Sequence, residues 1–273
     1  MVENKILIPV DFTEASDKAI EFGIHIAAKM HAGISLLHVF EDDGITMEEC
    51  EEKLRKLSLN VNARDDAFSD YICQKGNIFE VIPEIASKSA FRLMIVGAHG
   101  RKGLRQKFFG ADIIKLLKRI PIPALVVQKT SVMPEKGFSK TVFPVGSHDA
   151  YERKIEAMFL IAGLCDPEIH IYSISKPGFE QSEQLRQNIK LAEARFKEKG
   201  IAYFRVDEDQ NVFSVGFAKQ TLAYAREIGA NMISIMVNPT REYAYFADSD
   251  KEAIIMNEQG IPVLCTSDAE ALV

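Results

Sequence analysis

An internal repeat constrains the fold of this 273-residue chain more than any other feature. Three pairs of segments match: Lys5–Val10 with Lys140–Val145, 34–39 with 169–174, and Ile122-Pro123 with Ile261-Pro262. The first two pairs share an offset of 135 residues, and the third has an offset of 139. Two tandem copies of one unit explain this pattern better than one large domain does. We therefore predict domains at 1–128 and 140–273, joined by a linker at 129–139.

Within each copy, short apolar runs alternate with segments of helical periodicity. The first run, Ile6–Val10, is apolar throughout, as in a strand that is buried on both faces. Thr13 can cap the helix that follows, in which apolar residues recur at three- and four-residue spacing as far as Met30. The strands expected in the first copy are 6–10, 34–39, 67–73, 93–96 and 124–127. This alternation predicts an α/β fold with two tandem open parallel five-stranded sheets, each with helices on both faces.

The charge balance excludes several classes of function. Lys and Arg number 33 against 39 Asp and Glu, which gives a net charge of −6 and a pI near 5.6. A nucleic-acid binder needs a basic footprint for phosphate contacts, and so does a protein that docks on an anionic membrane surface. No segment approaches the ~20 apolar residues of a membrane span, and the amino terminus lacks the core of a signal peptide. We expect a cytoplasmic protein that binds neither nucleic acid nor membrane.

The four cysteines are widely scattered, at positions 50, 73, 165 and 265. They form no C-x-x-C pair, and no cluster with histidine has the spacing of a zinc site. We expect buried, reduced thiols, as is usual in a reducing cytosol, and no metal site formed by the protein.

Ligands of open parallel sheets bind beyond the carboxyl ends of the strands, where the strand order reverses. Pro9, Val10, Asp11 and Thr13 lie at the end of the first strand, and the Asp11 carboxylate can accept hydrogen bonds from a ribose hydroxyl or an adenine amine. The alternative is that Asp11 and Thr13 only cap a helix. Val39 ends the second strand, where its backbone can meet a base or simply close a buried strand.

A glycine-rich segment follows the fourth strand. After Val96 come Gly97 and Gly100, and nine residues later Gly110 precedes a predicted helix at Ala111. Glycines let the backbone approach a ligand closely, and their amides, with a helix amino terminus, can cradle phosphates. Arg101 adds positive charge. The segment is neither a P-loop nor the dinucleotide G-x-G-x-x-G motif.

These residues resemble those of the universal stress protein family, in a tandem two-domain form. The resemblance lies in ILIPVDFTEAS (6–16), SLLHV (35–39), LMIVGAHGRKGLRQKFFGA (93–111) and IPIPALVV (120–127). It implies an adenine-nucleotide α-hydrolase-like, Rossmann-like fold, and ATP, with Mg²⁺, bound in the N-terminal domain. It also implies self-association through the final strands of the two domains, within one chain or in a homodimer. The implied binding residues are Pro9, Val10, Asp11, Thr13, Val39, Val96, Gly97, Gly100, Arg101, Gly110 and Ala111.

The sequence departs from the family's nucleotide motif in both copies. In the first, Ala111 replaces a Ser or Thr and Asp112 adds negative charge. Loss of one hydrogen bond to a phosphate weakens binding by roughly 0.5–1.5 kcal/mol. In the second, the residues aligned with Asp11, Gly97, Gly100 and Gly110 are Gly146, Met236, Pro239 and Ser249. Because Pro239 has a fixed φ and no amide hydrogen, we expect no nucleotide in the second copy.

The sequence leaves two functions open. The first is an ATP-binding stress-response regulator with its site in the N-terminal domain only. No general base or nucleophile is recognisable, so we do not expect an enzyme, although slow ATP hydrolysis is compatible with such a site. The alternative is a nucleotide-free structural or interaction protein that acts through dimerisation or partner binding.

Overall fold

The computed structural model describes residues 4–41, 45–64, 67–98, 111–173, 181–207, 216–240 and 247–270. It divides into two compact units. Unit 1 comprises Met1–Ser131 with Ala269–Val273, and unit 2 comprises Val132–Asp268. The division falls inside the segment that the repeat marks as a linker, whereas the assignment of the last residues to unit 1 was not expected from the repeat.

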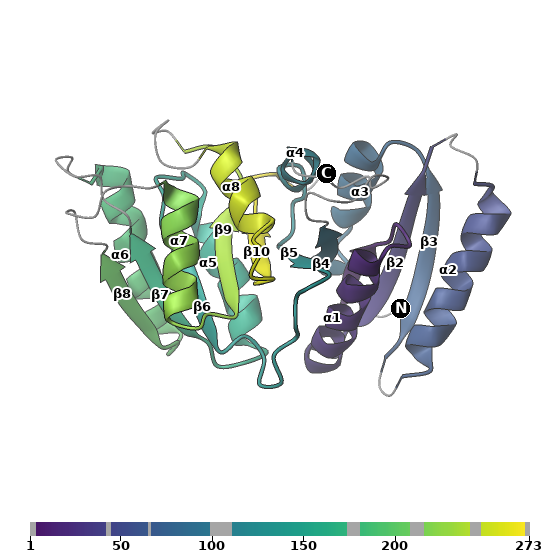
Figure 1. Cartoon of the computed structure of the whole chain (residues 1–273), viewed down its shortest axis with the longest axis horizontal. Coiled ribbons are helices and arrows are strands. Elements are labelled where there is room, and N and C mark those ends of the chain that lie inside the picture. Colours follow the sequence, from purple (N-terminus) through teal and green to yellow (C-terminus); the bar gives the residue numbers. More distant parts are fainter. Residues whose placement is uncertain are drawn as a thin grey trace. The chain divides into compact units, whose positions relative to one another are not determined.

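Unit 1 alternates strands and helices along the chain (Figure 1). Its elements are β1 (Lys5–Pro9), α1 (Glu14–Met30), β2 (Gly33–Phe40), α2 (Met47–Asn62), β3 (Ser69–Lys75), α3 (Ile78–Ala86), β4 (Phe91–Ala98), α4 (Ala111–Leu117) and β5 (Ala124–Gln128). The strands are parallel, in the order β3-β2-β1-β4-β5. Right-handed crossovers place α1 and α2 on one face of this sheet and α3 and α4 on the other.

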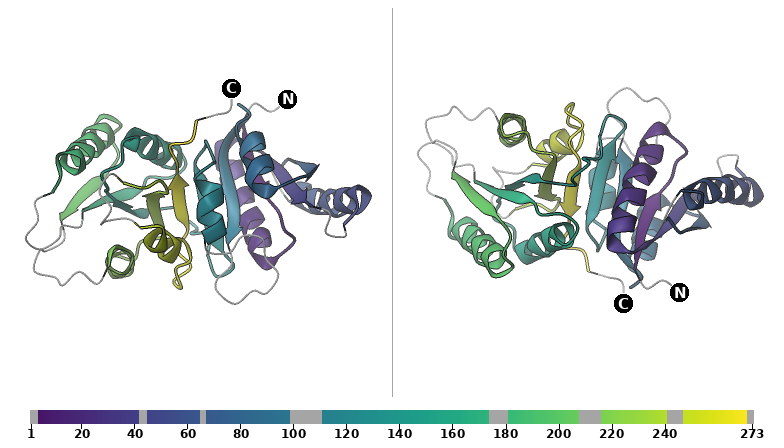
Figure 2. Two further views of the ribbon diagram at one scale, coloured as in Figure 1. Left: turned by 90° about the horizontal axis from the view of Figure 1, so that it is seen from above. Right: turned by 90° about the horizontal axis from the view of Figure 1, so that it is seen from below.

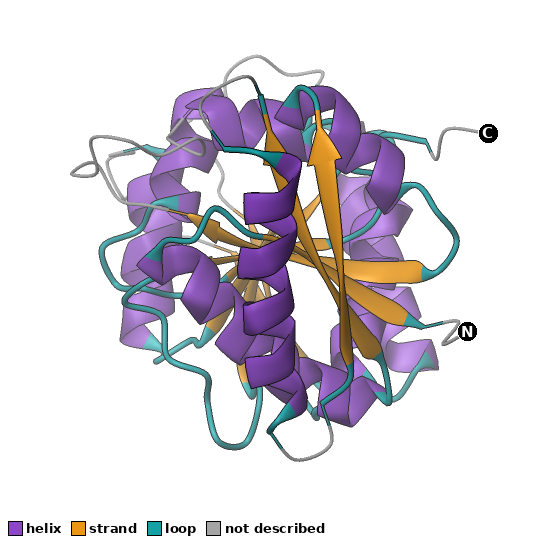
Figure 3. Ribbon diagram, turned by 90° about the vertical axis from the view of Figure 1, so that its right-hand side faces the viewer, coloured by secondary structure: helices purple, strands orange, loops and turns teal. Residues whose placement is uncertain are grey.

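Unit 2 repeats the same arrangement. Its elements are β6 (Lys140–Pro144), α5 (Tyr151–Ala162), β7 (Glu168–Ser173), α6 (Glu183–Glu198), β8 (Tyr203–Asp207), α7 (Phe217–Glu227), β9 (Met232–Met236), α8 (Asp248–Ile255) and β10 (Val263–Thr266). The strands are again parallel, in the order β10-β9-β6-β7-β8. Helices flank the strands on both faces in each unit (Figures 2 and 3). The predicted fold class is therefore confirmed.

The hydrophobic pattern explains where the core of unit 1 lies. Ile6, Leu7 and Ile8 of the central strand β1 are completely buried, as their uninterrupted apolar run predicts. The apolar residues of α1 that recur at helical spacing form one buried stripe against the sheet. In contrast, Ser69 is the one buried residue of the outer strand β3, which pairs with β2 along a single edge, and its other residues are half-buried or exposed.

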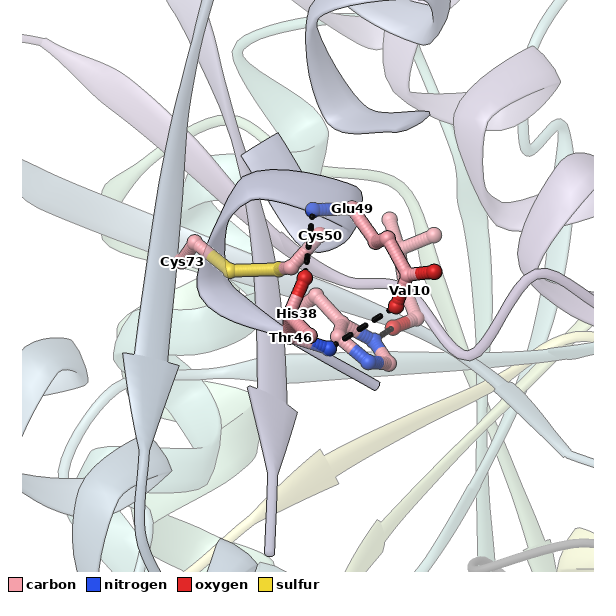
Figure 4. Close-up of a disulfide and its surroundings, with 6 residues drawn as sticks. All are labelled: Val10, His38, Thr46, Glu49, Cys50 and Cys73. Carbon is pink, nitrogen blue, oxygen red and sulfur yellow. Dashed lines mark hydrogen bonds between the residues drawn. A yellow bond between two sulfur atoms is a disulfide. The ribbon is translucent and has the colours of Figure 1, made fainter. Parts of the chain in front are cut away.

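The expectation of four reduced thiols is wrong for one pair. Cys50 of α2 and Cys73 of β3 form a disulfide with a Cα–Cα distance of 6.4 Å (Figure 4). A separation of 23 residues does not identify such a pair, because contact arises only when α2 packs on β3. Cys165 and Cys265 are reduced thiols, and complete burial raises the pKa of the Cys265 thiol.

Two kinds of feature are absent from the described residues. No helix among them is both long and apolar enough to cross a membrane. No group of three or more His, Cys, Asp or Glu side chains in this part of the chain is placed to hold a metal ion.

Candidate functional site

Three predicted binding segments of unit 1 lie together at the carboxyl edge of its sheet. β1 pairs with β2 on one side and with β4 on the other. The chain builds outward from β1 to β3 and then returns to β4 and β5, so the strand order reverses between β1 and β4. We call the Val10–Thr13 loop, the end of β2 and the end of β4 the edge site. This is the position at which open α/β sheets bind ligands.

The loop after β1 is held by its own polar side chains. The backbone N–H of Val10 donates to the carbonyl oxygen of Leu37 at 2.7 Å, which ties the loop to β2. Asp11 Oδ1 accepts hydrogen bonds from the backbone N–H and the hydroxyl of Thr13, at 3.2 and 2.5 Å. The Thr13 N–H also lies 3.1 Å from the Ser16 hydroxyl oxygen. Thr13 is the N-cap of α1, so the capping role that the sequence offered as an alternative is present.

Phe12 stands out in this loop because its backbone is in the left-handed region, with φ of 60°. A bulky residue at positive φ is strained by roughly 1–3 kcal/mol, and such strain is concentrated at binding sites. Phe12 is 37% exposed, and the centroid of its ring lies 4.6 Å from that of the His38 ring. Lys53 Nζ lies 5.5 Å from the Phe12 ring centroid. Sequence reasoning missed Phe12, although an aromatic residue directly after the strand-end aspartate was a usable signal.

His38 links the loop to the end of β2. Its Nδ1 lies 2.6 Å from the carbonyl oxygen of Val10, and the ring is almost fully buried (Figure 4). Because a carbonyl oxygen only accepts hydrogen bonds, Nδ1 carries the proton. The next residue, Val39, is buried in β2 at the same edge. His38 therefore fixes the loop next to the backbone segment expected to meet a base.

Gly97 brings β4 close to the first turn of α1. A Cβ atom at Gly97 would lie 2.2 Å from the carbonyl oxygen of Ala15 and 2.7 Å from the backbone nitrogen of Ser16. The absence of a side chain at Gly97 is therefore required for helix–strand packing, and contact of its backbone with a ligand stays a prediction. Val96 is completely buried just before it.

The rest of the predicted phosphate loop is not described. Gly100, Arg101 and Gly110 lie outside the described residues, as does the side chain of Ala111. The backbone of Ala111 begins α4, as predicted, and the next residue, Asp112, is exposed in the first turn of that helix.

The equivalent edge of unit 2 is filled by side chains of the chain itself. His148, after β6, is 4% exposed, and its Nε2 donates to the carbonyl oxygen of Asn238 at 3.1 Å. Lys154 and Lys251 are buried beside it. Lys154 Nζ donates to the carbonyl oxygen of Pro144 and lies 3.8 Å from the Phe143 ring centroid.

Burial changes the ionisation of these groups. It lowers the pKa of His148 from 6.5 to about 3, and the nearby charges of Lys154 and Lys251 act in the same direction. Burial also lowers the pKa of Lys154 well below its usual value. Lys251 Nζ donates to the carbonyl oxygen of Asn238 at 2.9 Å and to Asp248 Oδ1 at 3.3 Å. These buried side chains of unit 2 occupy the edge of its sheet that corresponds to the Val10–Thr13 loop and Gly97 in unit 1.

Comparison with known proteins relates the first half of the chain to a known family. The model of the universal stress protein family matches residues 3–128. This chain contains a universal stress protein domain. The universal stress protein YxiE of Bacillus subtilis is 25% identical over 146 residues, which cover 46% of this chain and 99% of YxiE. The family resemblance read from the sequence is thus confirmed.

Solved structures extend the likeness in fold to both units. The universal stress protein of Archaeoglobus fulgidus superposes with a TM-score of 0.72 at 16% identity, covering 98% of this chain and 99% of that protein. A putative universal stress protein of Pseudomonas aeruginosa gives a TM-score of 0.61 at 15% identity, covering 97% of this chain and 93% of that protein. At these identities the likeness concerns the fold alone. It includes unit 2, which the family model does not reach.

Proposed function

We propose that unit 1 binds an adenine nucleotide, ATP with Mg²⁺, at the edge site, and that this cytoplasmic chain acts as a nucleotide-responsive regulator in stress. The observation that carries the proposal is the Val10–Thr13 loop. It brings a carboxylate, a strained and exposed aromatic ring and a helix start to the point where the strand order reverses. The match of residues 3–128 to the family supports it.

The described residues fit the base and ribose of such a ligand. The exposed ring of Phe12 offers a flat face, and stacking between a base and an aromatic ring contributes ~1–3 kcal/mol. The Asp11 carboxylate is a hydrogen-bond acceptor suited to ribose hydroxyls, and the backbone at Val39 is suited to the edge of adenine. Contact of the phosphates with Gly100, Arg101, Gly110 and Ala111 stays a prediction.

We propose binding, and not catalysis, as the output of this site. Asp11 Oδ1 already accepts two hydrogen bonds from Thr13, so the carboxylate holds the loop in shape. A general base needs a carboxylate oxygen within reach of the proton that it removes. The role of Asp11 is therefore to position the loop and to accept hydrogen bonds from the ribose.

Calorimetry of the full chain with Mg-ATP tests the site. Asp11→Asn keeps an oxygen for Thr13 and removes the charge, and we expect the affinity to fall about tenfold or more. Asp17→Asn is the matched control, because Asp17 is an exposed carboxylate in the first turn of the same helix. Equal affinities for wild type and Asp11→Asn would refute the assigned site.

A second candidate function has an observation of its own. The edge of unit 2 is filled by His148, Lys154 and Lys251, as in a domain that serves for interaction and not for ligand binding. This favours the alternative of a nucleotide-free protein that associates through its final strands, β5 and β10, within a chain or as a homodimer. Sedimentation of the full chain measures its association, and calorimetry measures the heat evolved on adding Mg-ATP. Association without such heat distinguishes this alternative from nucleotide binding.

A further inference from the structure

We propose that the Cys50–Cys73 disulfide is a reversible thiol–disulfide exchange site that controls the edge site of unit 1. Its co-reactants are low-molecular-weight thiols and their disulfides. The coupling to the edge site rests on the proposed nucleotide binding, whereas the exchange chemistry does not. In the reducing cytoplasm that we propose for this chain, disulfides are usually transient and redox-sensing, so a disulfide beside a candidate binding site fits regulation better than permanent stabilisation.

The disulfide fastens one end of α2, and a different set of contacts fastens the other. At the amino-terminal end of α2, Cys50 is completely buried and bonded to Cys73. At the carboxyl-terminal end, the Ser58 hydroxyl lies 2.9 Å from that of Ser69, and Asn62 Oδ1 accepts from the backbone N–H of Ser69 at 2.5 Å. Reduction therefore frees the first end of α2 while the second stays attached to β3.

The two cysteine residues differ in their exposure to solvent. Cys73 is partly exposed on the outer strand β3, whereas Cys50 is buried in the first turn of α2. An external thiolate thus attacks Cys73 Sγ, where it forms a mixed disulfide as the Cys50–Cys73 bond breaks and Cys50 leaves as a thiolate. The helix dipole at the first turn stabilises that negative charge. A second thiol molecule then releases Cys73, so two thiols become one small disulfide and the protein gains two protons and two electrons.

The freed end of α2 is the end that faces the edge site. Cys73 pairs in register with His38, whose ring donates a hydrogen bond to the carbonyl oxygen of Val10 (Figure 4). Lys53, one turn after Cys50, places its ammonium group 5.5 Å from the Phe12 ring centroid. Closing the disulfide therefore holds a cation and the end of β2 against the loop that we assign to the nucleotide.

The first experiment measures the exchange itself in the full chain. Samples are equilibrated in glutathione buffers of increasing reduced-to-oxidised ratio, the thiols are trapped with maleimide after unfolding, and the labels are located by mass spectrometry. We expect Cys50 and Cys73 to open together in the native protein as the ratio rises. The variant with Cys165→Ser and Cys265→Ser is expected to behave identically. A pair that stays closed in reduced glutathione, or stays open in oxidised glutathione, would overturn the proposal.

The second experiment measures the consequence. Hydrogen exchange is followed with the disulfide closed, with it opened, and in Cys73→Ser, whose pair cannot close. We expect loss of protection at 47–54, but not at 58–62, in the two open states. Mg-ATP affinity should be about fivefold or more higher in the closed state. Redox-dependent exchange at 47–54 without any ATP binding refutes nucleotide binding alone, whereas ATP binding that is equal in both states refutes the coupling.

Discussion

Replacement of Gly97 by alanine tests how unit 1 is built. Gly97 lies in the buried part of β4, and the Cβ of an alanine there would lie 2.2 Å from the carbonyl oxygen of Ala15 and 2.3 Å from its carbonyl carbon. Ordinary van der Waals contact begins at 3.4 Å, so the first turn of α1 has to move by more than 1 Å. The clash is with backbone atoms, and no side-chain rotation relieves it.

Two opposing effects set the magnitude. Overpacking of a close-packed interior costs about 1–3 kcal/mol. The alanine also lowers the conformational entropy of the unfolded chain, which returns roughly 0.4–1 kcal/mol. We expect a net loss of about 1–2 kcal/mol in the free energy of unfolding of unit 1. With a denaturant dependence of ~1–3 kcal/mol per molar urea, the midpoint falls by about 1 M.

Unit 2 shows what happens when a side chain is present at this position. Met236 is aligned with Gly97 and is buried. The offset of 135 residues would start α5 at Asp149, yet α5 begins at Tyr151, with Ala150 as its N-cap. The helix thus starts two residues later where the glycine is missing.

Peptide-resolved hydrogen exchange in urea separates the unfolding of the two units in the full chain. Gly97→Ala should shift the midpoint for β1 and β4 and leave β6 and β9 unchanged. Gly163→Ala is the matched control, because its new Cβ would meet the nearest heavy atoms at 3.5 Å and its φ is −67°. If Gly97→Ala were as stable as wild type, the close approach of β4 to α1 would not be what requires glycine.

Three further predictions follow from the same structure. Phe12→Asn replaces a bulky residue at a φ of 60° with one that tolerates positive φ. The free energy of unfolding should be unchanged or rise by up to about 1 kcal/mol, while the Mg-ATP affinity measured by calorimetry falls. A clear loss of stability would contradict the claim that Phe12 is strained. His148 stays neutral in the folded state down to about pH 3 but protonates near 6.5 when unfolded, so unfolding takes up a proton in this range and stability falls by about 1.4 kcal/mol per pH unit on acidification. His148→Gln should flatten that dependence between pH 4 and 6 in urea titrations, and an unchanged slope would exclude His148 as its source. The Cys50–Cys73 disulfide closes a loop of 23 residues, so its reduction should lower the free energy of unfolding by about 3 kcal/mol. Cys50→Ser should have the same effect without reductant. No change in either case would mean that the disulfide constrains the unfolded chain little.

Local pattern was sufficient to predict the elements of unit 1. The run at 6–10 became β1, and the helical stripe after Thr13 became α1, because both kinds of periodicity depend on neighbouring residues only. The edge of the sheet that carries Asp11, Val39 and Gly97 also followed, since parallel strands bring their carboxyl ends to one side.

The properties of individual site residues did not follow from pattern. The sequence left two roles for Asp11, helix capping and ligand binding. Only its hydrogen bonds with Thr13 show that it organises the loop. The ring of Phe12 gave no periodic signal, because its importance lies in a backbone angle and in its contact with His38.

By itself, the sequence determined the duplication, the alternation of strands and helices and the edge at which chemistry can occur, since these depend on short-range spacing and on an alignment of the chain with itself. Only the tertiary structure decided that Cys50 bonds to Cys73, that Gly97 packs against the backbone of Ala15, and that buried side chains of unit 2 occupy the edge of its own sheet. Each of these is a contact between segments distant in the chain. Such contacts exist only after packing has brought the segments within a few ångströms of one another.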